Sequence, residues 1–430
     1  MKTTRRKFLF NTAMASGALI SGASCTMGKK NPNNKADYSR LDEVLNLPVF
    51  KRDLFPDPII IDKVEVLIKD ASCIYRVRSK DGAEGISIGH SFVAKGSYPM
   101  VPYVLAQYFE GKDARDLDQL IFNAVELNVR NQGTPMDVQV AGIEFAILDM
   151  MGIIANKPAG QLIGELQRTR VPIYLGTHFS NLRKLEPEQS LALMQEDVDI
   201  TSAKAIKLRA GLGNQLGANG DNAPGRTEKL IRMAREKFGD DMVLMIDGNG
   251  SYSVDEAIRI GRILEDYNYD FFEEPLPWTW YEEQKELEPT LDIKLAGGEE
   301  EFSLHAFRYL IGNGIFQIVQ PDIFYFGGMI RTMKVARMAE AAGLQITPHI
   351  SPGGLGFLYM LQMVSVCPAA YKYHEFKMFE MVDPNGVTIP VESKSGPFIS
   401  NNGVIEVPMG SGIGVTIDPD YIKTHKPFLG

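Results

Sequence analysis

This chain of 430 residues has few cysteines and no excess of positive charge. Its formal net charge is −9, which argues against nucleic acid as a partner. Of the three cysteines, Cys73 and Cys367 could pair, but two thiols so far apart in sequence are more often unpaired and buried. Low-complexity repeats are absent as well, and the ordinary composition excludes disordered, collagen-like and membrane-channel proteins.

The first 25 residues have the pattern of an export signal. A twin-arginine motif, TRRKFL, spans residues 4–9, and a short apolar stretch through Ile20 is followed by small residues. The stretch is too short to cross a membrane as a helix. Cys25 could carry a lipid, with residues 26–55 as a tether, although Gly22 stands where a larger aliphatic residue is usual. We expect twin-arginine export, to the periplasm or to the membrane as a lipoprotein; an unprocessed tail is the alternative.

Six apolar runs in the second half of the chain each end in a side chain that can bind a metal or move a proton. In chain order they are VLMID, YDFFE, IKLAGGE, FQIVQPD, LQITPH and YKYHE, which end at Asp247, Glu273, Glu299, Asp322, His349 and Glu375. These end residues are 26, 26, 23, 27 and 26 residues apart, about the length of one strand, one helix and two short loops. Because parallel strands buried on both faces read as continuous apolar runs, this rhythm predicts a β/α barrel. A barrel's chemistry lies at the C-terminal ends of its strands, so six such ends at one mouth predict an enzyme.

We expect an α/β protein with a TIM-type barrel of seven or eight β/α units over residues 171–381, preceded by an α+β domain over residues 56–170. The first domain begins with the strand-like segments IIIDKVEVLIK and CIYRVRSK and continues through helices that include AGIEFAILDMMG. VPIYLG and KAIKL are the first two barrel strands, and a glycine- and asparagine-rich insertion at residues 211–225 is a loop at the mouth. Residues 382–430 are expected to fold back on the first domain or to close the barrel's flank.

Asp247, Glu273 and Glu299 lie on three successive strand ends, which places three carboxylates around one point. Without a cation they would raise one another's pKa, and a hard divalent cation removes that cost. Ligation by oxygen alone favours Mg²⁺ over zinc. Each carboxylate by itself could cap a helix or pair with a lysine, but three in register favour a metal site. Asn249 could support the metal or accept a substrate hydroxyl, although the turn in DGNGS is the preferred explanation. Three neighbouring glutamates are expected to face outward or to cap helices: Glu274, Glu300 and Glu301.

A proton-transfer pair and two cations are predicted on other strand ends. Asp322 and His349 end neighbouring strands, so Asp322 can accept a hydrogen bond from one imidazole nitrogen and leave the other facing the mouth as a base. Lys207 and Arg209 lie two residues apart on one strand and therefore share a face. Two cations in a barrel interior require an anion, which is either a substrate carboxylate or the carboxylates of the metal site.

Six further polar side chains are candidates for the site or lie beside it. Glu375 ends the predicted eighth strand and could share a proton with a substrate carboxylate oxygen. The adjacent His374 points the other way and is expected to be structural. Loops that could overhang the mouth contribute four candidates for substrate binding, each of which could also be ordinary loop polarity: His90, Tyr98, Thr177 and His178.

These motifs resemble the enolase superfamily and, within it, the mandelate racemase subgroup. The matching segments are IKLRAG, MIDGNG, FFEEP, GGE, QPD, TPH and HEF, and AGIEFAILDMMG resembles the helix that links the family's capping domain to the barrel. The resemblance covers residues 56–430 and implies a capping domain completed by the C-terminal segment. It also implies Mg²⁺-dependent removal of the proton next to a carboxylate, in which Lys207 stabilises the enediolate and His349 is the base. Glu375 would donate a hydrogen bond to the second carboxylate oxygen.

One departure from the family pattern bears on the reaction. Racemases of the subgroup place a second lysine, the base for the opposite face, where this chain has Arg209, and arginine is a poor base. The resemblance therefore favours dehydration of an aldonate or aldarate to a 2-keto-3-deoxy acid, with protonated His349 helping the β-hydroxyl leave as water. An epimerase, racemase or cycloisomerase is the alternative among enzymes, and a sugar-acid binding lipoprotein without turnover is the alternative outside them. We expect a small-molecule carboxylate as partner and a homo-oligomer.

Overall fold

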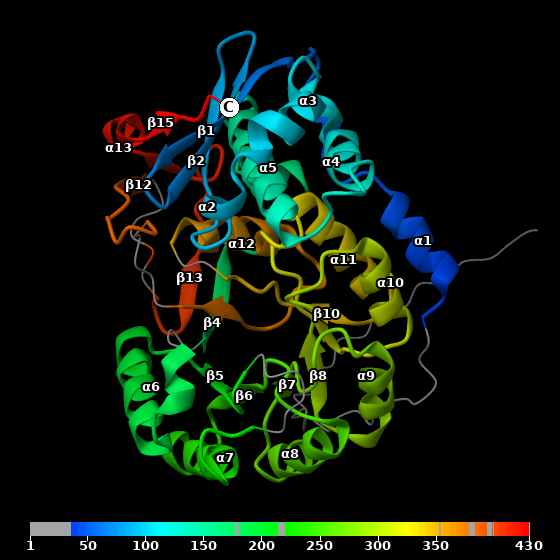
Figure 1. The fold of residues 1–430 in the computed structure, drawn as a ribbon, viewed down its shortest axis with the longest axis vertical. Helices are drawn as coiled ribbons and strands as arrows, with labels where there is room; N and C mark the ends of the chain where they lie inside the picture. The colour runs from blue at the N-terminus through cyan, green and yellow to red at the C-terminus, as the bar shows by residue number, and fades with distance from the viewer. Residues whose placement is uncertain are drawn as a thin grey trace, which may run out of the picture. The chain divides into compact units, whose positions relative to one another are not determined.

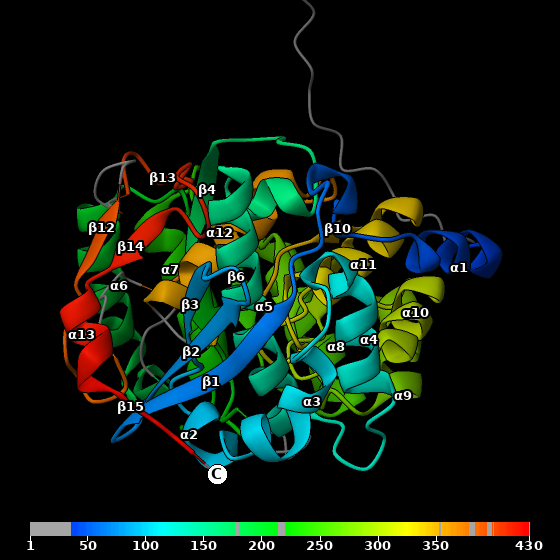
Figure 2. The same ribbon diagram turned by 90° about the horizontal axis from the view of Figure 1, so that it is seen from above.

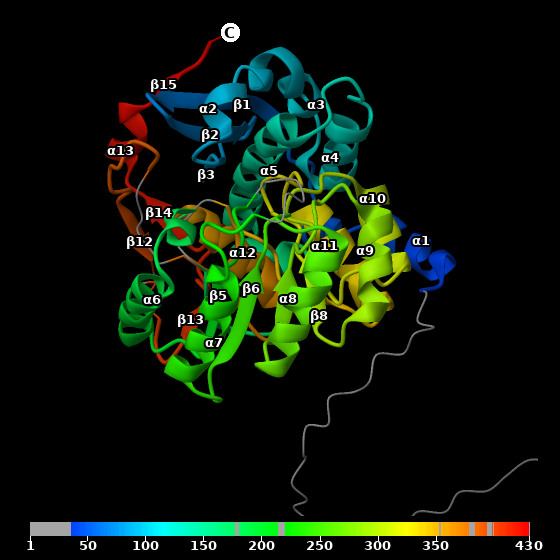
Figure 3. The ribbon, with the colours of Figure 1, turned by 60° about the horizontal axis from the view of Figure 1, so that its bottom comes forward.

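The computed structural model describes residues 36–176, 180–213, 220–351, 354–377, 383–393, 398 and 400–429. Within these residues, eight parallel strands form the barrel sheet, in the order β10-β9-β8-β7-β6-β5-β4-β11. Figures 1 and 3 show barrel strands with helices packed around them. The two ends of this sheet meet where Ile346 pairs in parallel with Ala370, just before β11. The strands are β4 (Arg170–Gly176), β5 (Ala205–Arg209), β6 (Val243–Asp247), β7 (Phe271–Glu273), β8 (Lys294–Gly297), β9 (Ile318–Val319), β10 (Gln345–Ile346) and β11 (His374–Phe376).

A helix follows each of the first seven barrel strands in chain order, so strand and helix alternate as the spacing predicted. The helix α8, for example, buries Ala257, Ile260 and Leu264, and residues three or four apart form one face of a helix. In the described part of the chain these helices are α6 (Pro187–Thr201), α7 (Arg226–Phe238), α8 (Val254–Asp266), α9 (Tyr281–Leu287), α10 (Leu304–Gly312), α11 (Met329–Ala341) and α12 (Leu355–Val366).

A layer of side chains fills the barrel interior and forms a floor beneath the strand ends. Its members come from strands around the barrel and from the segment before β11, and all are at least 96% buried: Tyr174, Ala205, Met245, Phe271, Ala296, Ile318 and Tyr371. Because this layer is packed, the space for chemistry lies above it, at the C-terminal ends of the strands.

The first domain is an antiparallel sheet packed on helices, here called the cap (Figure 2). Its strands are β1 (Ile61–Lys69), β2 (Ser72–Ser79) and β3 (Glu84–Ile88), and its helices are α2 (Ala94–Ser97), α3 (Ala106–Phe109), α4 (Leu117–Glu126) and α5 (Thr134–Ala155). Gly142 lets α5 approach β2 closely, since a Cβ there would lie 2.4 Å from the Tyr75 ring. Among the described residues, α5 is the one helix long and apolar enough to cross a membrane, but it is buried inside the protein.

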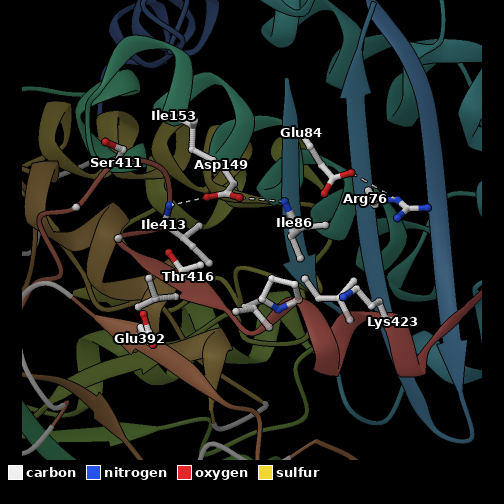
Figure 4. A pocket seen from close by; sticks show the side chains of 16 residues that line it. Arg76, Glu84, Ile86, Asp149, Ile153, Glu392, Ser411, Ile413, Thr416 and Lys423 are labelled. Atoms are coloured by element: carbon white, nitrogen blue, oxygen red, sulfur yellow. Dashed lines mark hydrogen bonds and ion pairs between the residues drawn. The ribbon is translucent and has the colours of Figure 1, made fainter. Parts of the chain in front are cut away.

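The C-terminal segment packs on both the cap and the barrel. Its strands are β12 (Val391–Ser393), β13 (Val404–Glu406), β14 (Val415–Ile417) and β15 (Lys426–Pro427), with the helix α13 (Pro419–Thr424) before the last. β13 pairs with barrel strand β4, and β15 extends the cap sheet beside β1. Asp149 on α5 accepts hydrogen bonds from the backbone of Ile86 (2.9 Å) and Ile413 (3.0 Å), and so ties the segment to the cap at a groove (Figure 4). The C-terminal segment therefore completes the cap, as the family resemblance implied.

The expected tether is wrong for residues 36–55. The helix α1 (Tyr38–Asn46) packs against α10 and α11 on the outside of the barrel, with Leu41 fully buried. Arg308 fixes the helix by a bidentate ion pair with Asp42 and by stacking its guanidinium 4.4 Å from the centre of the Tyr38 ring. The polar composition suggested a tether because α1 buries only one narrow face. Residues 26–35 lie outside the described residues.

Short helical turns complete the element list. In the described part of the chain these are η1 (Arg52–Leu54), η2 (Val101–Leu105), η3 (Ala114–Asp116), η4 (Ala159–Leu162), η5 (Ser180–Lys184) and η6 (Glu288–Thr290). Cys73 and Cys367 are buried free thiols, as the sequence predicted.

Candidate active site

Three carboxylates meet at the barrel mouth, where the strand ends predicted them. Asp247 is the last residue of β6, Glu273 is the last residue of β7, and Glu299 follows β8 by two residues. Asp247 and Glu273 are direct partners in the parallel register of β6 and β7. The three side chains are at least 94% buried, and each offers a ligand atom within 4.8 Å of the others. This carboxylate cluster could therefore hold a metal ion.

The charges around the cluster fit a divalent cation. Burial raises the pKa of Glu273 to about 8. The negative charge of Asp247 adds to this rise, whereas the positive charge of Lys207 reduces it. Glu299 Oε2 is buried without a hydrogen-bond partner in the described structure, 3.3 Å from His349 Nε2. A hard cation would neutralise the repulsion between the carboxylates and would coordinate the Glu299 oxygen that has no hydrogen-bond partner.

Lys207 and Arg209 occupy the centre of the cluster, as their shared strand face predicted. Lys207 Nζ lies 2.5 Å from Glu273 Oε1 and 3.9 Å from Asp247 Oδ2, and it is fully buried. Arg209 pairs with Asp247 and with the side-chain oxygen of Asn249. Burial disfavours both cations, but the surrounding carboxylates raise the pKa of each above its ordinary value. Both side chains therefore stay charged.

Asn249 serves the turn and the cluster at once. Its backbone is left-handed (φ 41°), and its N–H donates to Asp247 Oδ1 at 2.8 Å, which is the predicted turn. Its Nδ2 also donates to Glu299 Oε1 at 3.0 Å. Arg183, from η5, donates to the Asn249 side-chain oxygen at 2.5 Å and was missed because it lies outside any apolar run. Gln320 was missed as well, although it stands in the QPD motif; its Nε2 donates to Glu273 Oε2 at 2.7 Å.

Asp322 and His349 form the predicted pair. Their backbones make an isolated parallel bridge, and His349 Nδ1 lies 2.8 Å from Asp322 Oδ2, which leaves Nε2 facing the carboxylate cluster. Burial opposes ionisation of Asp322, but its hydrogen bond to His349 holds its pKa below the ordinary value. Burial by itself would lower the pKa of His349. The nearby carboxylates of Glu299, Glu375 and Asp322 have the larger effect, so the pKa of His349 lies above its ordinary value. The imidazole is therefore a stronger base than an isolated histidine.

Glu375, on β11, lies between two lysines. Its Oε1 lies 3.3 Å from Lys207 Nζ, and its Oε2 lies 3.5 Å from the Nζ of Lys377. Burial by itself would raise the pKa of Glu375, but the ammonium groups of Lys207 and Lys377 hold that pKa far below its ordinary value. The two ammonium groups favour the ionised form of Glu375, and its sharing of a proton with a substrate carboxylate oxygen stays a prediction. The neighbouring His374 is structural as predicted: its buried Nδ1 lies 3.1 Å from Thr347 Oγ1, and burial lowers its pKa to about 3.

Of the three glutamates left out of the metal set, Glu301 is buried and accepts hydrogen bonds from the backbone N–H groups of Phe302 and Ser303 just before α10, whose N-cap is Ser303. The expectation is wrong for Glu274, which is 4% exposed and whose pKa burial raises well above its ordinary value. Its backbone N–H donates to the Ala296 carbonyl, and its left-handed φ of 38° ends strand β7. Glu300 is half-buried, and burial raises its pKa to about 7.

One of the predicted cap residues reaches the barrel. His90 is 1% exposed, and its ring packs on Phe324 and Tyr325, which follow the Asp322 strand end, with centroid distances of 5.6 and 5.1 Å. Burial lowers the pKa of His90 to about 4, so its imidazole is neutral. Tyr98 instead packs on Phe428 of the C-terminal segment at 5.0 Å. Thr177 and His178 lie outside the described residues.

Comparison with known proteins decides the family. The model of the enolase C-terminal domain-like family matches residues 189–421. The chain belongs to this family. Its strand ends carry the motifs that resembled the enolase superfamily, and the cap and barrel have the architecture that the resemblance implied.

Relatives of this enolase superfamily member are enzymes. A candidate racemase from Roseobacter denitrificans has a solved structure that is 30% identical, with a TM-score of 0.79 over 86% of this chain and 99% of that one. A mandelate racemase/muconate lactonizing protein from Paracoccus denitrificans PD1222, complexed with magnesium, is 26% identical, with a TM-score of 0.75 over 86% and 99% of the two chains. The D-gluconate dehydratase of Thermoproteus tenax is 24% identical over 376 residues, 86% of this chain and 73% of that protein. The chain is therefore an enzyme, and a binding protein without turnover finds no support.

Proposed function

We propose that this enzyme is a Mg²⁺-dependent dehydratase of a sugar acid, an aldonate or aldarate, and that it yields a 2-keto-3-deoxy acid. The observation that carries the proposal is the orientation of His349, whose Nδ1 is held by Asp322 at 2.8 Å while Nε2 faces the carboxylate cluster. The similarity to a sugar-acid dehydratase supports the reaction class. The magnesium in a related solved structure supports the choice of metal, for which Asp247, Glu273 and Glu299 would be the ligands.

The described side chains divide the reaction between them. Lys207 binds the substrate carboxylate beside the cluster, where bound Mg²⁺ would neutralise the charge of the developing enediolate. His349 Nε2 removes the α-proton, and Asp322 stabilises the resulting imidazolium through Nδ1. The imidazolium then gives its proton to the β-hydroxyl, which leaves as water with the C–O bonding electrons. The remaining enol tautomerises to the 2-keto acid.

Arg209 supports dehydration over racemisation. Racemisation through an enediolate needs a base on each face of the α-carbon, and a guanidinium paired with Asp247 keeps its proton. His349 therefore acts as the single base in this proposal. Isomerisation remains the second candidate because the candidate racemase is 30% identical to this chain. Deuterium entering the α-position from solvent without loss of water would favour the isomerase.

The test is a screen of aldonates and aldarates with purified enzyme and Mg²⁺, followed by detection of 2-keto acids. Epimers without any 2-keto acid would refute the dehydratase. In the variant His349→Asn we expect turnover to fall by about 10²- to 10⁴-fold, the usual effect of a general acid–base, with substrate affinity retained. His305→Asn is the matched control, because His305 is exposed on α10 and should leave turnover unchanged. Unchanged activity in His349→Asn would rule out the mechanism.

We also propose that the enzyme is exported by the twin-arginine route and anchored through a lipid on Cys25, with a tether that ends before α1. The motif TRRKFL and the small residues before Cys25 support this proposal. Replacing Arg5 and Arg6 by lysine should retain the protein in the cytoplasm, whereas Cys25→Ala should release it from the membrane fraction. A homo-oligomer is proposed as well, and light scattering of the purified enzyme tests it.

A further inference from the structure

Lys377 is a cation of the site that no strand-end pattern predicted. It follows β11 directly, two residues after Glu375. Its side chain is 16% exposed, and its Nζ donates a hydrogen bond to the backbone carbonyl of Ile350 at 2.5 Å. The same ammonium lies 3.5 Å from Glu375 Oε2 and 3.4 Å from His349 Nε2. Lys377 therefore touches the base itself and the carboxylate beside it.

Two lysines hold Glu375 from opposite sides. Lys207 comes from β5 and Lys377 from the end of β11, and these strands flank β4 in the barrel. Lys207 faces Oε1 of Glu375 and Lys377 faces Oε2. A carboxylate between two ammonium groups accepts hydrogen bonds and donates none. A substrate carboxylate placed beside Glu375 would therefore be repelled unless a cation met it there.

The hydrogen-bonding capacity of Lys377 leaves one donor for such a substrate. An ammonium has three N–H donors. One donates to the Ile350 carbonyl, and the ammonium is also ion-paired with Glu375 Oε2 at 3.5 Å. Another N–H contacts His349 Nε2, the atom that the proposed reaction needs for the α-proton. A substrate oxygen in this space would accept the hydrogen bond from that N–H and leave the lone pair of His349 available. The contact to His349 is thus one that a bound substrate would replace.

We propose that Lys377 is a catalytic residue whose ammonium donates to the substrate carboxylate oxygen on the Glu375 side and stabilises that oxygen as the enediolate forms. Lys207 would bind the carboxylate from the side of the carboxylate cluster, so the two lysines clamp it. The stabilisation of the enediolate rests on the proposed function, whereas the binding of a carboxylate does not. Glu375 in turn holds both ammonium groups in position.

The experiment measures the binding of oxalate, a planar dianion that resembles the enediolate, to the full chain loaded with Mg²⁺. In Lys377→Gln we expect calorimetry to show oxalate affinity reduced by about 10- to 100-fold, the effect of removing a hydrogen bond to a charged group. Lys372→Gln is the matched control. Lys372 lies before the same strand, is 51% exposed and pairs with Asp270 at 3.4 Å, so its loss should leave oxalate affinity unchanged.

A second variant separates charge from folding. Lys377→Arg keeps a cationic donor and should restore oxalate affinity to within about fivefold of wild type. Failure of Lys377→Arg to restore binding, in a protein that melts as wild type does, would overturn the proposal. Unchanged oxalate affinity in Lys377→Gln together with a shifted pH profile of turnover would also overturn it, because Lys377 would then act only through His349.

The outcome distinguishes this proposal from the proposed function. If no sugar acid is dehydrated but oxalate binding depends on Lys377, the dehydratase fails and the carboxylate contact stands. If a sugar acid is dehydrated and Lys377→Gln retains the wild-type kcat/KM, the dehydratase stands and the role of Lys377 fails. Loss of both oxalate affinity and kcat/KM in Lys377→Gln, with Lys372→Gln unaffected, supports the two together.

Discussion

Asp322 accepts four hydrogen bonds, and the variant Asp322→Asn tests how far the base depends on them. Oδ2 accepts from His349 Nδ1 and from the backbone N–H of Ser351, both at 2.8 Å. Oδ1 accepts from the backbone N–H groups of Phe324 (2.8 Å) and Tyr325 (3.0 Å). An amide offers one oxygen, so it can serve only one of these two pairs, and its nitrogen accepts nothing. With the oxygen on Phe324 and Tyr325, the amide N–H donates to His349 Nδ1.

This rearrangement moves the imidazole proton to Nε2, where the lone pair is needed. We expect kcat to fall by about 10³- to 10⁴-fold, as in other enzymes whose histidine loses its orienting aspartate in this way. The unpaired N–H of Ser351 should also lower the free energy of unfolding by about 1–3 kcal/mol. The assays are single-turnover kinetics with α-deuterated substrate and urea denaturation. Asp292→Asn is the control, because the Asp292 side chain is 93% exposed.

The two measurements together can refute the reasoning. Suppose the free energy of unfolding of Asp322→Asn falls as expected but kcat stays within tenfold of wild type. The hydrogen bonds would then be present, yet the reactive tautomer of His349 would not depend on Asp322. Either another group would orient the imidazole or His349 would not be the base.

Three further predictions concern the metal, pH and the first helix. Glu299→Gln should weaken Mg²⁺ binding by at least about 10- to 100-fold in calorimetry, and unchanged affinity would place the metal elsewhere. Burial raises the pKa of Asp137 to about 7 and of Glu144 to about 8. The folded state therefore binds more protons than the unfolded state between about pH 4 and 8, and the free energy of unfolding falls as pH rises, by up to about 1.4 kcal/mol per pH unit for each group. Glu144→Gln should flatten this slope in denaturation at several pH values, and an unaltered slope would contradict the assignment. Leu41→Ala should cost about 2–5 kcal/mol of unfolding free energy, whereas Leu47→Ala, at a 49% exposed position, should cost under about 0.5 kcal/mol; equal costs would show that α1 does not fold with the barrel.

The barrel and its six strand ends could be predicted because both depend on local sequence and on one general rule. Apolar runs of strand length recur between helical segments, and parallel strands of a barrel all point their C-terminal ends to the same mouth. Asp247 and Glu273 are therefore neighbours in register, and Asp322 and His349 pair across one bridge.

Residues outside the strand ends could not be placed in this way. Arg183 lies in a turn after the first barrel strand, and its contact to Asn249 depends on the path of that turn. In the sequence Tyr98 comes after the cap strands, as His90 does. In the structure Tyr98 lies at the end of α2 and packs on Phe428 of the C-terminal segment. The prediction of a tether was wrong for the same reason, because the apolar face of α1 is buried only when the helix packs against α10 and α11. Each of these contacts joins segments far apart in the chain.

The sequence by itself determined the barrel, the carboxylate cluster and the pairing of Asp322 with His349, since these follow from residue types at the spacing of consecutive strands. The tertiary structure alone decided the charge states in the mouth. Glu375 was expected to donate a hydrogen bond to a substrate carboxylate oxygen, and the structure adds that Lys207 and Lys377 approach it from two strands and favour its ionised form. The charge of a buried group is set by its partners in space, and partners from non-adjacent strands cannot be read from the order of residues.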